Sequence, residues 1–203
     1  MSESNAPEAR PYHHGDLRRA LVDAARRLLE AEGAAAMSLR AVAREAGVSP
    51  AAPYHHFKDK GELMSAVASE GWALLSSTML QASNDNPDDD LATTIAYITF
   101  ALSRSALYRV MFDSAREHES LPFVDVAEKD TPYARVRETL TSTRKDASIV
   151  DIELGIAASW CATHGLAEMV GFRQFDHLKE ALGGQTPFLR AILTHMRLET
   201  HKR

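Results

Sequence analysis

Apolar residues recur at helical spacing along most of the chain. Near the N-terminus, apolar positions from Leu17 to Leu28 fall on one face of a helix. We expect this helix to run from about His14 to Glu32 and to end at Gly33. No stretch alternates apolar and polar residues with the period of two that a β-strand with one buried face requires. The pattern therefore predicts an all-α chain.

Two short helices joined by a tight turn come next. Apolar residues from Leu39 to Ala46 fall at i, i+3, i+4 and i+7, with Ser38 before them as an N-cap. Gly47 supplies the left-handed residue that ends such a helix. Ser49 and the proline after it then predict a second helix over about residues 50–57. A helix, a short turn with glycine and a second helix form the helix-turn-helix arrangement, whose second helix enters a DNA major groove.

Pro53 is unusual inside the second of these helices. It has no N–H for the first intrahelical hydrogen bond, and it disfavours the α conformation at Ala52. We expect a stiff, irregular first turn rather than a broken helix.

A long helix and several shorter ones are predicted beyond this motif. Asp59 and Glu62 have the spacing of a capping box for a helix that reaches about Ser83, roughly 30–35 Å at ~1.5 Å per residue. Residues 84–90 then predict a turn, and lack the glycine and distal glutamate of a calcium loop. Further helices with polar connections, among them a loop over 114–122, are expected at about 91–102, 106–112, 131–140, 148–171 and 186–196. The helix at 148–171 is apolar almost all round, which predicts burial on several sides.

Charge is distributed unevenly along the 203 residues, whose net charge is −5. Residues 10–60 hold nine Lys and Arg against six acids, whereas residues 61–203 hold 14 against 20. A basic N-terminal part on an acidic body suits DNA binding by the N-terminal part alone. The single cysteine, Cys161, fits a reducing cytoplasm, and the longest uncharged run, Leu154 to Ala167, is too short to span a membrane.

Three spaced motifs resemble the DNA-binding domain of the tetracycline-repressor (TetR) family of transcriptional regulators. They are S-L-R-x-V-A-R-E-A-G-V-S from Ser38, Y-x-H-F from Tyr54 and K-x-K-x-x-L from Lys58. Trp160, His164 and Gly165 form a W-x-x-x-H-G that resembles the C-terminal domain of one branch of the family, named for those three letters. The polar residues 1–10, which contain no apolar run, predict a disordered arm. The resemblance implies a three-helix helix-turn-helix DNA-binding domain (11–60) and a helical effector-binding and dimerisation domain (61–203).

The candidate DNA contacts divide by chemistry. Arg40 and His55 are the residues expected to form hydrogen bonds with base edges. His56 has two open assignments, a phosphate contact or an interior position. The remaining candidates are expected to make apolar contacts to thymine methyl groups (Pro50, Ala51 and Ala52) or contacts to phosphates (Ser38, Ser49, Tyr54 and Lys60).

The candidate effector site is drawn from the large apolar or polar-tipped residues of the C-terminal helices. Trp160 and His164 share a helix face at i and i+4. A histidine beneath a core tryptophan is the alternative, and every member of the set would also serve as ordinary core. The set is Tyr97, Phe100, Met111, Phe112, Tyr133, Trp160 and His164.

We therefore expect a homodimeric repressor that binds double-stranded, palindromic operator DNA and is released by a small-molecule effector. A constitutive DNA-binding regulator without an effector is the first alternative. A helical metal-binding protein or enzyme is the second, and the sequence holds no H-E-x-x-H, C-x-x-C or glycine-rich phosphate loop to support it. We expect no cofactor, no metal ion and no membrane partner, and we interpret His13 and His14 as a polar entry to a helix.

Overall fold

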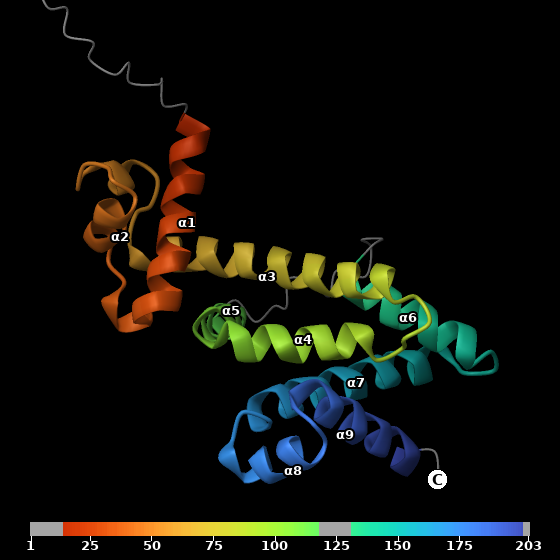
Figure 1. The fold of residues 1–203 in the computed structure, drawn as a ribbon. Helices are drawn as coiled ribbons and strands as arrows, with labels where there is room; N and C mark the ends of the chain where they lie inside the picture. The colour runs from red at the N-terminus through yellow and green to blue at the C-terminus, as the bar shows by residue number, and fades with distance from the viewer. Residues whose placement is uncertain (1–13, 118–130, 201–203) are drawn as a thin grey trace, which may run out of the picture. The chain divides into compact units, whose positions relative to one another are not determined.

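The computed structural model describes residues 14–117 and 131–200 (Figure 1). Every regular element in these two ranges is helical, which confirms the all-α prediction. In chain order they are the α-helices and 3₁₀ helices (η) α1 (His14–Glu32), η1 (Ala34–Ala36), α2 (Leu39–Glu45), η2 (Ala52–His55), α3 (Lys60–Asp85), α4 (Ala92–Ser103), α5 (Ser105–Glu117), α6 (Pro132–Thr143), α7 (Ile149–Met169), η3 (Arg173–Phe175), α8 (Asp176–Ala181) and α9 (Gln185–Thr200).

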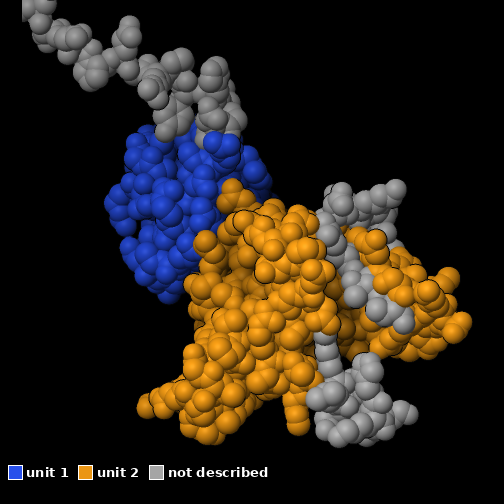
Figure 2. Space-filling model, turned by 45° about the vertical axis from the view of Figure 1, so that its right-hand side comes forward, with its two compact units in different colours: residues 1–67 blue, residues 68–203 orange. Residues whose placement is uncertain are grey.

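The chain forms two compact units, Met1–Val67 (unit 1) and Ala68–Arg203 (unit 2) (Figure 2). The helix α3 contributes residues to both of them. Leu63 and Val67, on its first turns, are fully buried. These side chains belong to unit 1, which therefore includes the first two turns of α3.

In unit 1, α1 packs against α2 and η1. The apolar face of α1 predicted from the sequence is buried, and the helix ends as expected where Gly33 takes φ 80° and donates its N–H to the carbonyl of Leu29 at 2.9 Å. Burial of this face against α2 contributes to the core of the unit. Its largest members are Leu21, Leu29, Val42, Phe57, Leu63 and Val67.

The start of α2 and the turn after it follow the prediction. The Ser38 hydroxyl accepts the N–H of Ala41 at 3.1 Å, which satisfies one of the free donors of the first turn. Gly47 has φ 69°. Val48 donates to the carbonyl of Ala43 at 2.9 Å, and Gly47 to that of Arg44 at 3.2 Å. These two bonds form a Schellman motif, and they fix the direction in which the chain leaves α2.

The second helix of the motif differs from the prediction: it is the 3₁₀ helix η2, not an α-helix over 50–57. In an α-helix, residue 53 would donate to the carbonyl of Ser49, and Pro53 has no N–H to donate. The N–H of Ala52 takes that carbonyl instead, at 3.0 Å. Tyr54 likewise donates to Ala51 at 3.2 Å, so the bonds span three residues. One bond of α-helical span, from Phe57 to Pro53 at 2.9 Å, closes the segment.

In unit 2, α4 runs alongside α7 and also contacts α9, while α6 packs on α7 (Figure 1). Two predicted helix starts are confirmed. Thr131 accepts the N–H of Ala134 at 3.1 Å to cap α6, and Ser148 forms a reciprocal capping box with Asp151 at the start of α7. One part of the core gathers where α4 meets α5 and α7, around Tyr97, Ile98, Leu107 and Met111.

Four details of unit 2 depart from the sequence pattern. The helix α5 extends to Glu117, replacing the start of the loop predicted over 114–122, because Ala115 faces the core; the rest of that loop lies outside the described residues. The helix α9 begins at Gln185, before the predicted cap Thr186, since Gly183 and Gly184 have positive φ and end the preceding turn. The elements η3 and α8 were not predicted.

The fourth departure concerns α7. The sequence pattern predicted burial on several sides of this helix, but the described residues of one chain do not bury it on all of them. One side, with Ile152, Ile156 and Leu166, is buried, whereas Val150 and Leu154 on the other side are 66% and 62% exposed. An apolar face is therefore left uncovered by the described residues of this chain.

Candidate functional sites

The ten residues predicted to contact DNA all reach the surface of unit 1. Two of them, Ala52 and His56, are partly buried. His56 therefore lies neither fully on the surface nor in the core. The other eight are exposed: Ser38, Arg40, Ser49, Pro50, Ala51, Tyr54, His55 and Lys60.

Two buried side chains hold η2 against the core while its polar side chains point outward. Pro53 is buried within η2 and Phe57 follows it with 1% exposure. The guanidinium group of Arg18 on α1 lies 5.1 Å from the centre of the Phe57 ring. Between these anchors, Tyr54 is 54% exposed and His55 is exposed. The anchoring gives the exposed pair a defined position on a short element.

Ser38 and Lys60 already have partners within unit 1. The Ser38 oxygen accepts a backbone N–H, and its own proton remains available to an acceptor. The Lys60 ammonium group donates to the carbonyl of Ala34 in η1 at 3.0 Å. Since an ammonium group has three donors, this bond leaves two for another oxygen.

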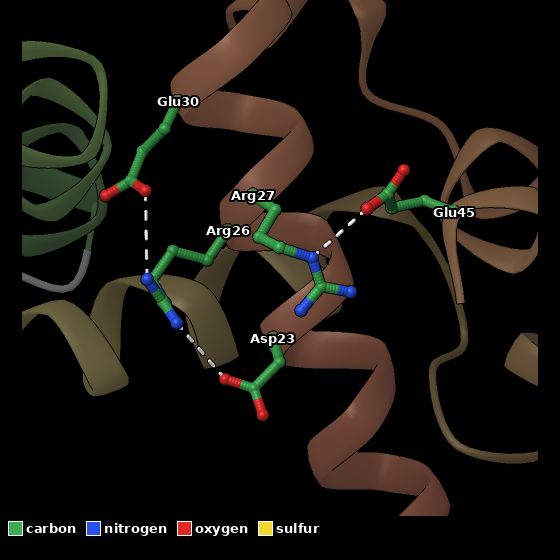
Figure 3. Close-up of polar contacts among 5 residues, drawn as sticks. All are labelled: Asp23, Arg26, Arg27, Glu30 and Glu45. Carbon is green, nitrogen blue, oxygen red and sulfur yellow. Dashed lines mark hydrogen bonds and ion pairs between the residues drawn. The ribbon is translucent and has the colours of Figure 1, made fainter.

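Ion pairs neutralise part of the charge of unit 1 away from Arg40. Figure 3 shows Arg26 turned toward Asp23 and Glu30 on its own helix, at 3.3 and 3.7 Å, and Arg27 turned toward Glu45 of α2, at 3.1 Å. The Arg27–Glu45 pair ties α1 to α2. Across residues 14–117 and 131–200, Arg40 and Arg44 form no ion pair, and both are exposed on α2. Their charge is therefore available to an anion at this surface.

Unit 2 contains a cavity of about 650 Å³. Of the seven residues predicted to bind an effector, Tyr97 and Trp160 line it. Its wall comes from the end of α3, the α3–α4 turn, α4, α6 and α7. The lining residues are Met79, Ser83, Asn84, Asn86, Pro87, Asp89, Asp90, Thr93, Thr94, Tyr97, Val136, Glu138, Leu140, Ser142, Ser159, Trp160 and Thr163.

The other five predicted effector residues lie outside the lining. Phe100 and Met111 are buried in the core, and Tyr133 is buried beside Ile152 and Ile156. The rings of Phe112 and His164 lie 4.4 Å apart. The sequence prediction considered only large residues and therefore missed the polar part of the cavity wall. The aspartates at the end of the predicted 84–90 turn could have indicated it.

A hydrogen-bonded cluster lies directly behind the cavity wall. The hydroxyl groups of Tyr97 and Tyr108 are 2.8 Å apart, and that of Tyr108 is 2.6 Å from Nδ1 of His164. The Trp160 ring meets the Tyr97 ring edge to face, with centres 5.5 Å apart. This cluster joins α4, α5 and α7 and connects one lining residue, Tyr97, to two residues that do not line the cavity.

Burial sets the proton positions in this cluster. It raises the pKa of Tyr108 to about 12 and that of Tyr97 further, and it lowers the pKa of His164. Both phenols therefore keep their protons at neutral pH, and the imidazole is favoured in its neutral form. Two arrangements fit these proton positions: Tyr97 donates to Tyr108 and Tyr108 to Nδ1 of His164, or, in the other imidazole tautomer, both hydrogen bonds run in the opposite direction.

The part of the chain that the structure describes contains no group of three or more His, Cys, Asp or Glu side chains placed to hold a metal ion. None of its helices is both long enough and apolar enough to cross a membrane.

Sequence comparisons match both parts of the chain to known families. A family model described as bacterial regulatory proteins, tetR family, matches residues 21–67, and one described as the tetracyclin repressor-like C-terminal domain matches residues 91–193. A protein of Haemophilus influenzae named as an uncharacterized HTH-type transcriptional regulator is 48% identical over 66 residues. The match covers 32% of this chain and 32% of that relative, so it spans about a third of either protein.

Two solved structures share the fold over most of the chain. A protein of unknown function from Rhodococcus sp. RHA1 is 28% identical, with a TM-score of 0.59 over 90% of this chain and 98% of that one. A structure of BioQ with its natural double-stranded DNA operator is 21% identical, with a TM-score of 0.50 over 79% of this chain and 91% of that one. At this identity the second likeness concerns the fold alone.

Proposed function

We propose that this chain, which belongs to the tetracycline-repressor family, is a DNA-binding transcriptional regulator and acts as a repressor. In this proposal a homodimer binds a palindromic operator and releases it when a small molecule occupies the cavity of unit 2. Regulators of this family are generally not enzymes, and we propose no catalytic activity for this one.

The observation that carries the DNA-binding mode is the anchored, outward-facing η2 segment beside the exposed Arg40. Buried Pro53 and Phe57 hold the segment, and the exposed His55 and the neighbouring Arg40 offer donors of the kind that read base edges. Exposed hydroxyl and ammonium groups at Ser38, Ser49, Tyr54 and Lys60 suit phosphate contacts. BioQ, which shares the fold, has a structure with its own double-stranded operator.

The uncovered face of α7 supports the homodimer. Val150, Leu154 and Met169 are exposed on this face, and Ala158 and Cys161 between them are exposed as well. Covering these apolar side chains with a second copy would remove them from water. A dimer is also expected physically, since a segment as short as η2 contacts few bases and two reading segments about 34 Å apart match successive turns of DNA.

The cavity supports an effector over the constitutive alternative. Its volume of about 650 Å³ lies within the range of roughly 300–1,000 Å³ that is usual for small-molecule sites. A fully packed unit 2 would have favoured the alternative. We further propose that the protein works in the cytoplasm, where its DNA partner lies and where the exposed thiol of Cys161 stays reduced.

Selection of bound sequences from a random pool of double-stranded DNA tests the proposal. We expect enrichment of an inverted repeat whose half-sites are about one helical turn apart. Enrichment of a single, unrepeated half-site would refute the dimeric mode, and no enrichment would refute sequence-specific binding. The selected operator then serves in a screen for small molecules that release it, and a regulator without an effector would give no hit.

A further inference from the structure

Carboxylate groups approach the cavity of unit 2 from two directions. Asp89 and Asp90 belong to the α3–α4 turn, whereas Glu138 belongs to α6. Among the described lining residues there is no Lys, Arg or His. A charged ligand that enters this cavity therefore meets negative groups on both of these walls and no positive group in the lining.

The rest of the lining suits an apolar, ring-containing body. Trp160 presents an aromatic ring, the buried Tyr97 ring packs behind it with the two centres 5.5 Å apart, and Met79 belongs to the same lining. An indole ring also attracts a cation to its face. Serine, threonine and asparagine side chains complete the wall without adding charge.

We propose that the cavity takes a small molecule with a positively charged group on an apolar, ring-containing body. The proposal rests on the proposed function, in which this cavity is the effector site, and adds the chemical class of the effector. The Trp160 ring, backed by Tyr97, holds the body, and the carboxylates of Asp89, Asp90 and Glu138 stabilise the charge. An anion with the same body is repelled by those carboxylates, because like charges repel one another.

One cation of the chain itself already occupies part of this negative wall. Arg190 of α9 lies outside the cavity lining and pairs with Asp89 through both of its terminal nitrogens, one of them 3.1 Å from Oδ1. The hydrogen bond to Asp89 raises the pKa of Arg190. Arg190 therefore acts as an internal counter-ion that competes with a bound cation for Asp89, and its removal should strengthen cation binding.

A matched series of probes with one ring system tests the class of ligand. The series is 2-naphthylmethyl-trimethylammonium, 2-naphthalenemethanol and 2-naphthoate, titrated calorimetrically into the full chain. We expect the cation to bind at least about ten-fold more tightly than the alcohol, which is ~1.4 kcal/mol, and the anion to bind most weakly. Equal or tighter binding of 2-naphthoate would overturn the proposal, as would binding of none of the three.

Charge-removing variants locate the effect in the cavity. Glu138→Gln and Asp90→Asn should each weaken binding of the cation several-fold and leave the alcohol unchanged. Arg190→Gln should instead tighten binding of the cation. Asp146→Asn, which removes the same charge at an exposed position outside the lining, is the control and should change nothing. Equal effects of Glu138→Gln and Asp146→Asn on cation affinity would overturn the proposal.

The outcome also separates this inference from the proposed function. If the anion binds in the cavity and releases the selected operator, the cavity is an effector site and only the ligand class is wrong. If the cation binds with the predicted charge dependence and leaves operator affinity unchanged, the ligand class is right and the proposed release is wrong.

Discussion

Lys60 stands at the first position of α3, where its ammonium group is held by the carbonyl of Ala34 at 3.0 Å. We predict that Lys60→Ala weakens binding to all DNA sequences to a similar degree and lowers the slope of log K against log salt by about one unit, because one phosphate contact is lost. Lys145→Ala, at an exposed lysine of unit 2, is the control. An unchanged salt slope for Lys60→Ala would show that Lys60 contacts no phosphate.

Arg40 and His55 are expected to act differently, since they are assigned to base edges. Alanine at either position should relax the preference for particular base pairs by ~1–3 kcal/mol, as measured by binding to single-base variants of the selected operator. Arg44→Ala removes a second exposed guanidinium from α2 and should leave these preferences intact. Uniform weakening across all operator variants would show that Arg40 and His55 contact phosphates and not base edges.

His164 predicts a pH dependence of stability. Burial lowers its pKa in the folded chain, so below about pH 6.5 the unfolded chain binds more protons than the folded one at this residue. This contribution to stability is therefore present above pH 6.5 and is lost as the pH falls toward the lowered pKa. Thermal unfolding should show a smaller loss of stability between pH 7.5 and 5.5 for His164→Asn, whose side-chain oxygen can still accept from Tyr108. Identical losses in the two proteins would contradict this account.

At the scale of elements, the sequence predicted those features that depend on neighbouring residues. The cap at Ser38 and the left-handed Gly47 each involve residues a few positions apart, and both are present. The 3₁₀ form of η2 was not predicted. The sequence shows that Pro53 lacks an N–H. Which other N–H donates to the carbonyl of Ser49 depends on how Pro53 and Phe57 are buried in the core.

The candidate effector site shows the same division between local and long-range information. Trp160 shares a face of α7 with His164, as the i, i+4 spacing predicts, yet only Trp160 lines the cavity. His164 instead shares a hydrogen bond with Tyr108 of α5, 56 residues away in the chain. Which large side chain fills the core and which faces empty space is decided by such long-range packing, so the sequence pattern could not separate the two.

The exposed face of α7 is the surface through which we expect two copies of the chain to form the homodimer. Ala158 lies on this face, and an arginine there would place an unpaired charge in the proposed interface, at a cost on the order of several kcal/mol. Ala158→Arg should sediment as a monomer and lose specific operator binding. Ala73→Arg, the same substitution at an exposed position of α3, should remain dimeric. A dimeric Ala158→Arg protein would place the interface elsewhere.

At the scale of the whole molecule, charge and function divide between the two units. The basic residues of region 10–60 lie in unit 1 with the candidate DNA contacts, and the excess of acidic residues lies in the remainder of the chain with the cavity. The helix α3, continuous from Lys60 to Asp85, begins beside η1 through Lys60 and lines the cavity through Met79 and Ser83. It is the element through which we expect ligand binding in unit 2 to affect DNA binding by unit 1.

Calorimetric titration of an effector found by the release screen, with and without the selected operator, tests this coupling most directly. Linkage requires that if the effector lowers operator affinity by a given factor, the operator lowers effector affinity by the same factor. A 100-fold release corresponds to ~2.7 kcal/mol of coupling. We predict equal factors in the two directions. Equal effector affinities in the presence and absence of operator would contradict the account.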